Sequence, residues 1–180
     1  SLNDTRMAAH ASNNLASVAH LRSRPDVALS LYRTALLDYQ RLGDRRGTAQ
    51  TYHNLGLAFR QRRDWNDAES ASLQAVRHAE AVGENSLTAL AVTGRAELHI
   101  DRGEMELANQ ELLRAERLAQ EAGDEVGLAE VGRLGALRAL KVSDYARAVE
   151  LALAARGVAQ RFGILQLQAE CAGVASVALR

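Results

Sequence analysis

The chain has 180 residues, of which 47% are hydrophobic and 24% are charged. This composition supplies enough apolar material for a folded core and excludes an intrinsically disordered chain. Lysine plus arginine equals aspartate plus glutamate, at 22 each, so no global electrostatic field favours nucleic acid or an anionic membrane as the partner.

The N-terminal sequence and the hydropathy pattern indicate a soluble, cytoplasmic protein. The segment SLNDTRMAAH lacks the features of a secretory signal, and no apolar run approaches the ~18 residues of a membrane span. The single cysteine, Cys171, cannot form an internal disulfide, and we expect it to be a small core residue. Nearly all basic residues are arginine, Lys141 being the only lysine, which hints at a GC-rich bacterial genome.

Glycine marks a forty-residue period along the chain. Gly43, Gly83, Gly123 and Gly163 each end a long alanine-rich segment with helical periodicity. Glycine has no Cβ penalty in the left-handed conformation that commonly ends a helix. A period of this length indicates helix pairs that stack, because one pair cannot bury its own apolar face.

The period predicts an all-α chain of four two-helix repeats and one further helix. The repeats span residues 4–43, 44–83, 84–123 and 124–163, and the last helix lies in 164–180. No strand pattern is present. We therefore expect about nine helices in a single domain over residues 1–180.

Short polar turns begin and divide the repeats. Asp44 and Asp124 follow the terminal glycines and suit the N-cap position, and Glu84 suits the positive end of the helix dipole. Asn3 stands forty residues before Gly43, so we expect it in the same left-handed site. A second turn divides each repeat, at residues 23–26, 63–64, 102–104 and 142–144.

Alanines recur with the same period in the second helix of each repeat. Two series lie seven residues apart and therefore on one helix face: they are Ala28, Ala68, Ala108 and Ala148, and Ala35, Ala75, Ala115 and Ala155. Small residues two turns apart let neighbouring helices approach closely.

The second repeat resembles the tetratricopeptide repeat (TPR). That family places an aromatic residue, Leu-Gly and a second aromatic on the first helix and alanines on the second. Here these residues are Tyr52, Leu55, Gly56, Phe59, Trp65, Ala68 and Ala75. The HEAT repeat, the alternative two-helix unit of similar length, lacks this pattern. The other repeats depart from it at the Leu-Gly position, where they carry Leu15-Ala16, Arg95-Ala96 and Gly135-Ala136.

The long unit is similar to the TPRs of bacterial LuxR- and AfsR-type regulators, Pins-type scaffolds and kinesin light chain, and the segment RLGDRRGTAQTYHNLGLAF carries this likeness. The resemblance implies a right-handed α-solenoid of antiparallel helix pairs. It also implies a non-catalytic module that binds proteins or peptides.

Residue patterns for catalysis, metal binding and nucleotide binding are not found in the sequence. The histidines lack a spacing that would place two metal ligands on one helix face, and they are His10, His20, His53, His78 and His99. The glycines stand singly at helix ends and form no phosphate loop. We expect no enzyme activity, no cofactor and no metal.

The resemblance implies that the first helix of every repeat lines a concave groove. The expected peptide-binding residues are His10, Asn13, Ser17, Gln50, His53, Asn54, Leu57, Arg60, Leu90, Thr93, Glu97, Glu130, Arg133 and Leu137. Amides and imidazoles suit an extended backbone, and leucines supply an apolar floor. Any solenoid has a concave face, so part of this set could serve solubility alone. A chaperone carboxylate clamp is disfavoured, because Leu90 and Gly94 stand where that clamp has basic residues.

Two functional hypotheses follow. The first is a scaffold or adaptor that binds a peptide or helix segment in the concave groove. The alternative is a sensor fragment of a larger bacterial transcription regulator. The last helix has more apolar residues than one helix face needs, which predicts either a homodimer through residues 164–180 or a natural chain that continues with further repeats.

Overall fold

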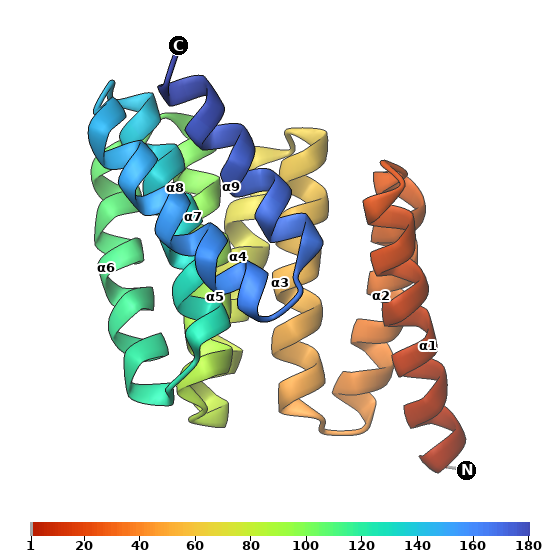
Figure 1. The fold of residues 1–180 in the computed structure, drawn as a ribbon. Coiled ribbons are helices and arrows are strands. Elements are labelled where there is room, and N and C mark those ends of the chain that lie inside the picture. The colour runs from red at the N-terminus through yellow and green to blue at the C-terminus, as the bar shows by residue number, and fades with distance from the viewer. Residues whose placement is uncertain (1) are drawn as a thin grey trace. The chain divides into compact units, whose positions relative to one another are not determined.

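The computed structural model describes residues 2–180 (Figure 1). Within that range the chain forms nine α-helices and no strand, which confirms the all-α prediction. The helices are α1 (Leu2–Leu21), α2 (Pro25–Arg41), α3 (Arg45–Arg62), α4 (Trp65–Val82), α5 (Asn85–Arg102), α6 (Met105–Ala122), α7 (Glu125–Lys141), α8 (Tyr145–Arg161) and α9 (Leu165–Ala178).

The repeat-ending glycines adopt the predicted left-handed conformation. Their φ angles are +66° at Gly43, +79° at Gly83, +66° at Gly123 and +68° at Gly163. A carboxylate caps the helix that follows two of these turns: Asp44 and Asp124 each accept a hydrogen bond, of 2.8 Å, from the backbone N–H three residues later. The turns between repeats are therefore set by local backbone chemistry.

The prediction for Asn3 is wrong. Asn3 lies in the first turn of α1, which is helical from Leu2 onward. Asp4 follows it in the same turn, where a carboxylate interacts favourably with the positive end of the helix dipole. The forty-residue spacing alone therefore did not identify a turn.

The turns within the repeats also use a left-handed residue, but it is glycine in only one of four repeats. Ser23, Arg63 and Ser143 have φ angles of +54°, +64° and +63°, and Gly103 has +79°. These positions are forty residues apart. A non-glycine residue in this region is strained by about 1 kcal/mol. The backbone bond that closes the turn, such as Asp144 N–H to Ala139 O at 2.9 Å, holds it there.

Both alanine series are buried, with no member more than 3% exposed. Consecutive helices pack against one another through these small residues, as in α1 with α2, α3 with α4 and α7 with α8. The remaining core is mostly further alanine, with leucine, valine and a few aromatic side chains. Cys171 is buried as expected, and burial raises the pKa of its thiol.

The chain divides into two compact units, one ending at Arg95 and the other beginning at Ala96. We call them the N-terminal and the C-terminal unit and describe each by itself. No helix within residues 2–180 combines the length and the apolar character needed to cross a membrane.

Candidate binding site on the first helices of the repeats

In the N-terminal unit, the predicted site residues of α1 and α3 contact one another. The amide of Asn54 donates from Nδ2 to Oδ1 of Asn13 at 3.4 Å. The hydroxyl of Ser17 donates to the backbone oxygen of Asn13 at 3.1 Å and lies 3.1 Å from the hydroxyl of Tyr32. Asn13, Ser17 and Asn54 are all half-buried. The first helices of two successive repeats are thus joined by neutral polar groups.

The two histidines predicted for the site in this unit, His10 and His53, have different surroundings. His10 is exposed, and its Nδ1 lies 2.9 Å from the hydroxyl of Tyr39. The ring of His53 lies against the backbone of Gly94, where a Cβ would approach two of its ring atoms to 2.7 Å. Only a glycine in α5 leaves room for this ring position.

His20 and Arg60 form a pair of basic groups. His20 is half-buried, and its Nδ1 is buried without a hydrogen-bond partner. Burial lowers the pKa of His20, and the positive charge of Arg60 lowers it further. His20 is therefore held in its neutral form near neutral pH.

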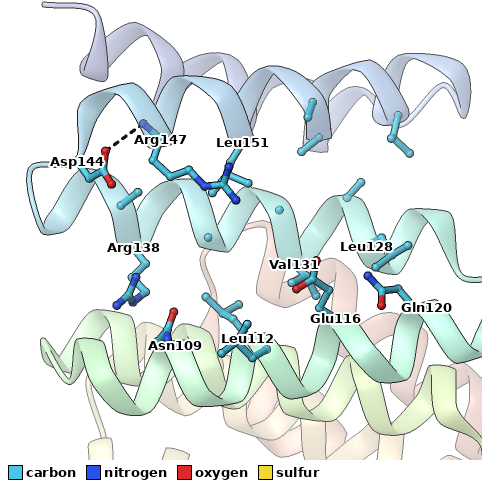
Figure 2. Close-up of a pocket in the computed structure, with 18 of the residues that line it drawn as sticks. Asn109, Leu112, Glu116, Gln120, Leu128, Val131, Arg138, Asp144, Arg147 and Leu151 are labelled. Atoms are coloured by element: carbon cyan, nitrogen blue, oxygen red, sulfur yellow. Dashed lines mark hydrogen bonds between the residues drawn. The ribbon is translucent and has the colours of Figure 1, made fainter.

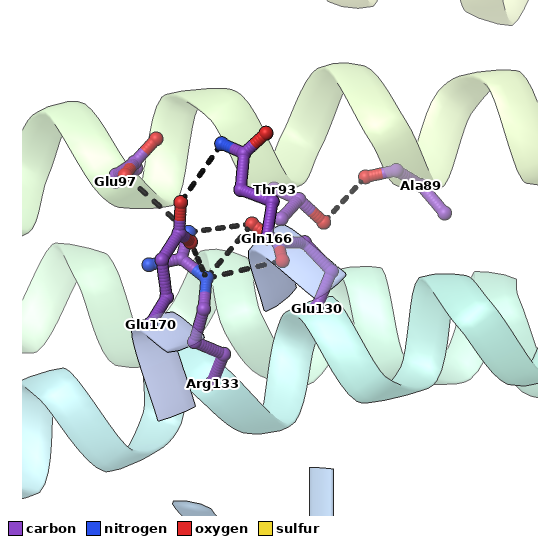
Figure 3. Close-up of polar contacts among 7 residues, drawn as sticks. All are labelled: Ala89, Thr93, Glu97, Glu130, Arg133, Gln166 and Glu170. Carbon is purple, nitrogen blue, oxygen red and sulfur yellow. Dashed lines mark hydrogen bonds and ion pairs between the residues drawn. The ribbon is translucent and has the colours of Figure 1, made fainter. Parts of the chain in front are cut away.

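In the C-terminal unit, three carboxylates from three first helices converge on one buried guanidinium (Figure 3). Arg133 of α7, whose side chain is 10% exposed, contacts Glu130 of the same helix at 2.5 Å. It also contacts Glu97 of α5 at 3.4 Å and Glu170 of α9 at 3.1 Å. Gln166 donates to the other oxygen of Glu170 at 2.9 Å. We call Arg133 and these three glutamates the Arg133 cluster.

The Arg133 cluster carries more negative than positive charge. Burial alone would lower the pKa of the Arg133 guanidinium, but the hydrogen bonds and charge of Glu130, with the charges of Glu97 and Glu170, raise it overall. Arg133 therefore remains charged. The Glu130 and Glu170 carboxylates remain partly exposed beside it and can attract a basic group.

The family model of the tetratricopeptide repeat matches residues 7–81. This range is less than half of the chain, so the match supports the tetratricopeptide-repeat family through the N-terminal repeats. This match confirms the resemblance drawn from the second repeat. TPR stacks create extended concave surfaces and are generally protein-interaction modules.

Among solved structures, the chain is similar to aspartyl phosphate phosphatase F from Bacillus subtilis. The TM-score is 0.80 at 16% sequence identity, and the match covers 97% of this chain and 46% of that one. At this identity the likeness concerns the fold, and the chain spans less than half the length of its neighbour. No curated protein sequence matches the chain.

The other predicted site residues lie on α3, α5 and α7. Thr93 is buried, and its hydroxyl donates to Ala89 O of its own helix at 2.8 Å (Figure 3). Leu90 is 41% exposed. Gln50, Leu57 and Leu137 are half-buried.

Sequence reasoning missed the site residues of the fifth first helix. Glu170 lies forty residues after Glu130, so the repeat register could have identified it. Gln166, one turn earlier, orients its carboxylate. Across residues 2–180, no group of three or more His, Cys, Asp or Glu side chains could hold a metal ion, and the three glutamates surround Arg133 instead.

Proposed function

We propose that the chain is a non-catalytic protein-interaction module that binds a peptide or helix segment of a partner along the first helices of its repeats. The observation that carries the proposal is that side chains from successive first helices meet on one face. Asn13 meets Asn54 in the N-terminal unit, and Glu97, Glu130 and Glu170 meet around Arg133 in the C-terminal unit.

The two units offer different groups to a partner. A primary amide can make up to four hydrogen bonds, so the Asn13 and Asn54 amides retain capacity to bind an extended backbone. The Arg133 cluster instead suits a lysine or arginine side chain, because the carboxylates of Glu130 and Glu170 are 34% and 39% exposed. The partner is therefore a protein or peptide, and we propose no direct contact with nucleic acid or membrane and a cytoplasmic location.

A second candidate is a regulatory role within a larger protein, such as a bacterial transcription regulator whose repeats restrain another domain. One observation favours it: the long TPR unit resembles those of such regulators. The name of the structural neighbour, aspartyl phosphate phosphatase F, assigns it an activity on aspartyl phosphate. We do not propose this activity here, because the fold alone is shared.

Self-association through residues 164–180 is a further part of the proposal. Leu165 and Leu179 are 77% and 73% exposed, and Val177 is exposed as well. Exposed apolar area of this kind tends to be covered by another chain or by further repeats. Light scattering tests the dimer, and Val177→Glu should make any dimer monomeric. A monomeric parent would remove the dimer from the proposal.

The binding proposal is tested with a partner identified by affinity capture and mass spectrometry and then purified. Its dissociation constant is measured by calorimetry for the parent and for a variant in which His53, Asn54 and Arg60 are alanine. We expect unchanged helicity and a dissociation constant raised at least about tenfold, since hydrogen-bonding groups are lost from one wall. The exposed α4 variant Arg77→Ala is the control. Equal affinity for all three chains would contradict the proposal.

A further inference from the structure

A groove lies between α6, α7 and α8 in the C-terminal unit (Figure 2). Its volume is about 450 Å³, within the range of roughly 300–1,000 Å³ that ligand-binding clefts occupy. Leu112 of α6 and Leu151 of α8 form part of its walls, and Gly132, Gly135 and Ala139 of α7 lie among the lining residues. The Arg133 cluster is not part of this lining.

The equivalent place in the N-terminal unit is filled. The positions eighty residues before Gly132, Gly135 and Ala139 hold Tyr52, Leu55 and Phe59. Leu55 and Phe59 are buried. The Tyr52 ring stacks on His78 with centroids 5.4 Å apart, and the Arg33 guanidinium lies 5.7 Å from the centroid of the Phe59 ring.

One wall of the groove is reduced in the same way. Tyr32 and Leu36 of α2 correspond to Leu112 and Glu116 of α6. Tyr32 is 2% exposed and is among the largest buried side chains of the N-terminal unit. The C-terminal unit therefore lacks the aromatic side chains that these repeat positions carry in the N-terminal unit, although Leu151 of α8 is larger than its counterpart Ala71.

The two groove glycines are not required by the backbone. Neither Gly132 nor Gly135 has a positive φ angle. A Cβ at Gly132 would lie 3.5 Å from the Cβ of Ala155, an ordinary contact. A glycine inside a helix costs about 1 kcal/mol relative to alanine. Two such glycines destabilise α7 and, in return, keep the groove open.

We propose that this groove docks an amphipathic helix from a partner protein, whose large apolar side chains occupy the volume that the small α7 residues leave. The groove has walls from α6 and α8 and a floor from α7, which suits a further helix laid over α7 between α6 and α8. The missing groups are an aromatic pair and a leucine, so the docking face of the partner should carry aromatic or leucine residues at helical spacing.

Charges at the ends of the groove specify the direction of the docked helix. Arg138 and Asn109 lie at one end together with Asp144 and Arg147, and the Arg147 guanidinium pairs with Glu150 at 2.7 Å. Glu116 and Gln120 lie toward the other end (Figure 2). Nε of Arg138 donates to the backbone carbonyl of Met105 at 2.9 Å. A carbonyl oxygen carries no net charge, so this hydrogen bond does not neutralise Arg138. The partner helix should therefore carry an acidic residue toward Arg138 and a basic residue toward Glu116.

The probe is a display library of alanine-based helical peptides of about 16 residues, randomised on one face. Selection on the parent chain should recover peptides with aromatic or leucine residues three or four positions apart. Their dissociation constants are then measured by fluorescence anisotropy. Failure to recover any binding helix overturns the proposal. So does binding of a small apolar probe, indole, in the groove when no helix binds.

A filled variant tests whether the groove is the site. It carries the N-terminal unit's residues: Gly132→Tyr, Gly135→Leu, Ala139→Phe and Leu151→Ala. The last change is needed because Leu151 Cδ1 would lie 3.3 Å from a Cβ at Gly135. We expect recovered peptides to bind at least about tenfold more weakly. The matched control is Gly157→Tyr, which adds a tyrosine to α8 where a Cβ meets nothing within 4 Å. Equal binding by parent and filled variant overturns the proposal.

A charge exchange keeps the test decisive if the filled variant folds poorly. Glu116 is exposed, so Glu116→Arg leaves the core intact. This variant should weaken a recovered peptide that carries lysine at the Glu116 end by about tenfold, and a Lys→Glu peptide should regain the loss. Unchanged affinity for both peptides overturns the proposed orientation and site.

Discussion

The two units follow one repeat plan and place different chemistry on it. In the N-terminal unit, neutral amides join the first helices, and aromatic side chains fill the space beside α3. In the C-terminal unit, a buried guanidinium joins the first helices, and glycines leave the space beside α7 open. The two buried alanine series, which we call the alanine seams, are present in both units. The fold therefore depends on the seams, and the remaining positions are available for recognition.

The seams should show the largest effect, and the effect should be equal in the two units. Ala68→Arg and Ala108→Arg each force a charged side chain into a contact where the alanine is at most 1% exposed. We expect a loss of about 4 kcal/mol or more in each case, measured by urea unfolding. The exposed alanines Ala81 and Ala122 provide matched arginine controls. A seam variant as stable as its control would show that the register is wrong.

The polar links should differ between the units. Arg133→Met removes the only cation of a cluster with three carboxylates and should cost about 3 kcal/mol. Asn54→Ala removes one neutral hydrogen bond and should cost about 1 kcal/mol. Adding Glu130→Gln to Arg133→Met should recover part of the loss, because one repelling charge is gone. If Arg133→Met and Asn54→Ala lose the same free energy of unfolding in chemical denaturation, the proposed difference between the polar links of the two units is wrong.

Acid should weaken the N-terminal unit through His20. Its folded pKa is lowered by burial and then by Arg60, from an ordinary value of 6.5. Below pH 6.5 the unfolded chain binds a proton that the folded chain resists, so this contribution to stability falls as the pH falls. His20→Gln should lose less stability than the parent between pH 7.5 and 5.5. Identical pH profiles by thermal unfolding would refute this role.

The smallest effect is expected at the turns within the repeats, and it should be alike in the two units. Ser23 and Ser143 are left-handed without being glycine. Replacing either by glycine should stabilise its unit by about 1 kcal/mol or less, since relief of strain is partly offset by the entropy of glycine in the unfolded chain. A calorimetric melting temperature that drops in both variants would contradict the strain argument.

Most of the fold could be predicted from the sequence because the repeat signals are local. A glycine at the end of a helix and a carboxylate cap act within one turn, so Gly43 and Asp44 identify themselves. Ser143 does not, because its conformation follows from the bond between Asp144 and Ala139 rather than from serine itself. The forty-residue spacing does not predict a turn where the backbone hydrogen bond that closes the turn is missing, as at Asn3.

The sequence predicted which helices carry the candidate site residues, but not which of these residues contact one another. The register placed Glu97, Glu130 and Arg133 on first helices, but their convergence on one guanidinium depends on rotamers and helix separation. Glu170 was within reach of the same register. The open groove is harder to predict from the small residues of α7 alone, because a neighbouring helix can fill the space that they leave. Leu151 of α8 fills part of the space next to Gly135.

The central claim is that a partner lies along the first helices, and site-specific photocrosslinking tests it most directly. Leu90 of α5 and Leu73 of α4 are both in the N-terminal unit and are 41% and 38% exposed. Each is replaced in turn by benzoylphenylalanine, and the captured partner is irradiated with each chain. We predict a crosslinked product from position 90, on a first helix, and none from position 73, on a second helix. Crosslinking from position 73 alone would contradict the account.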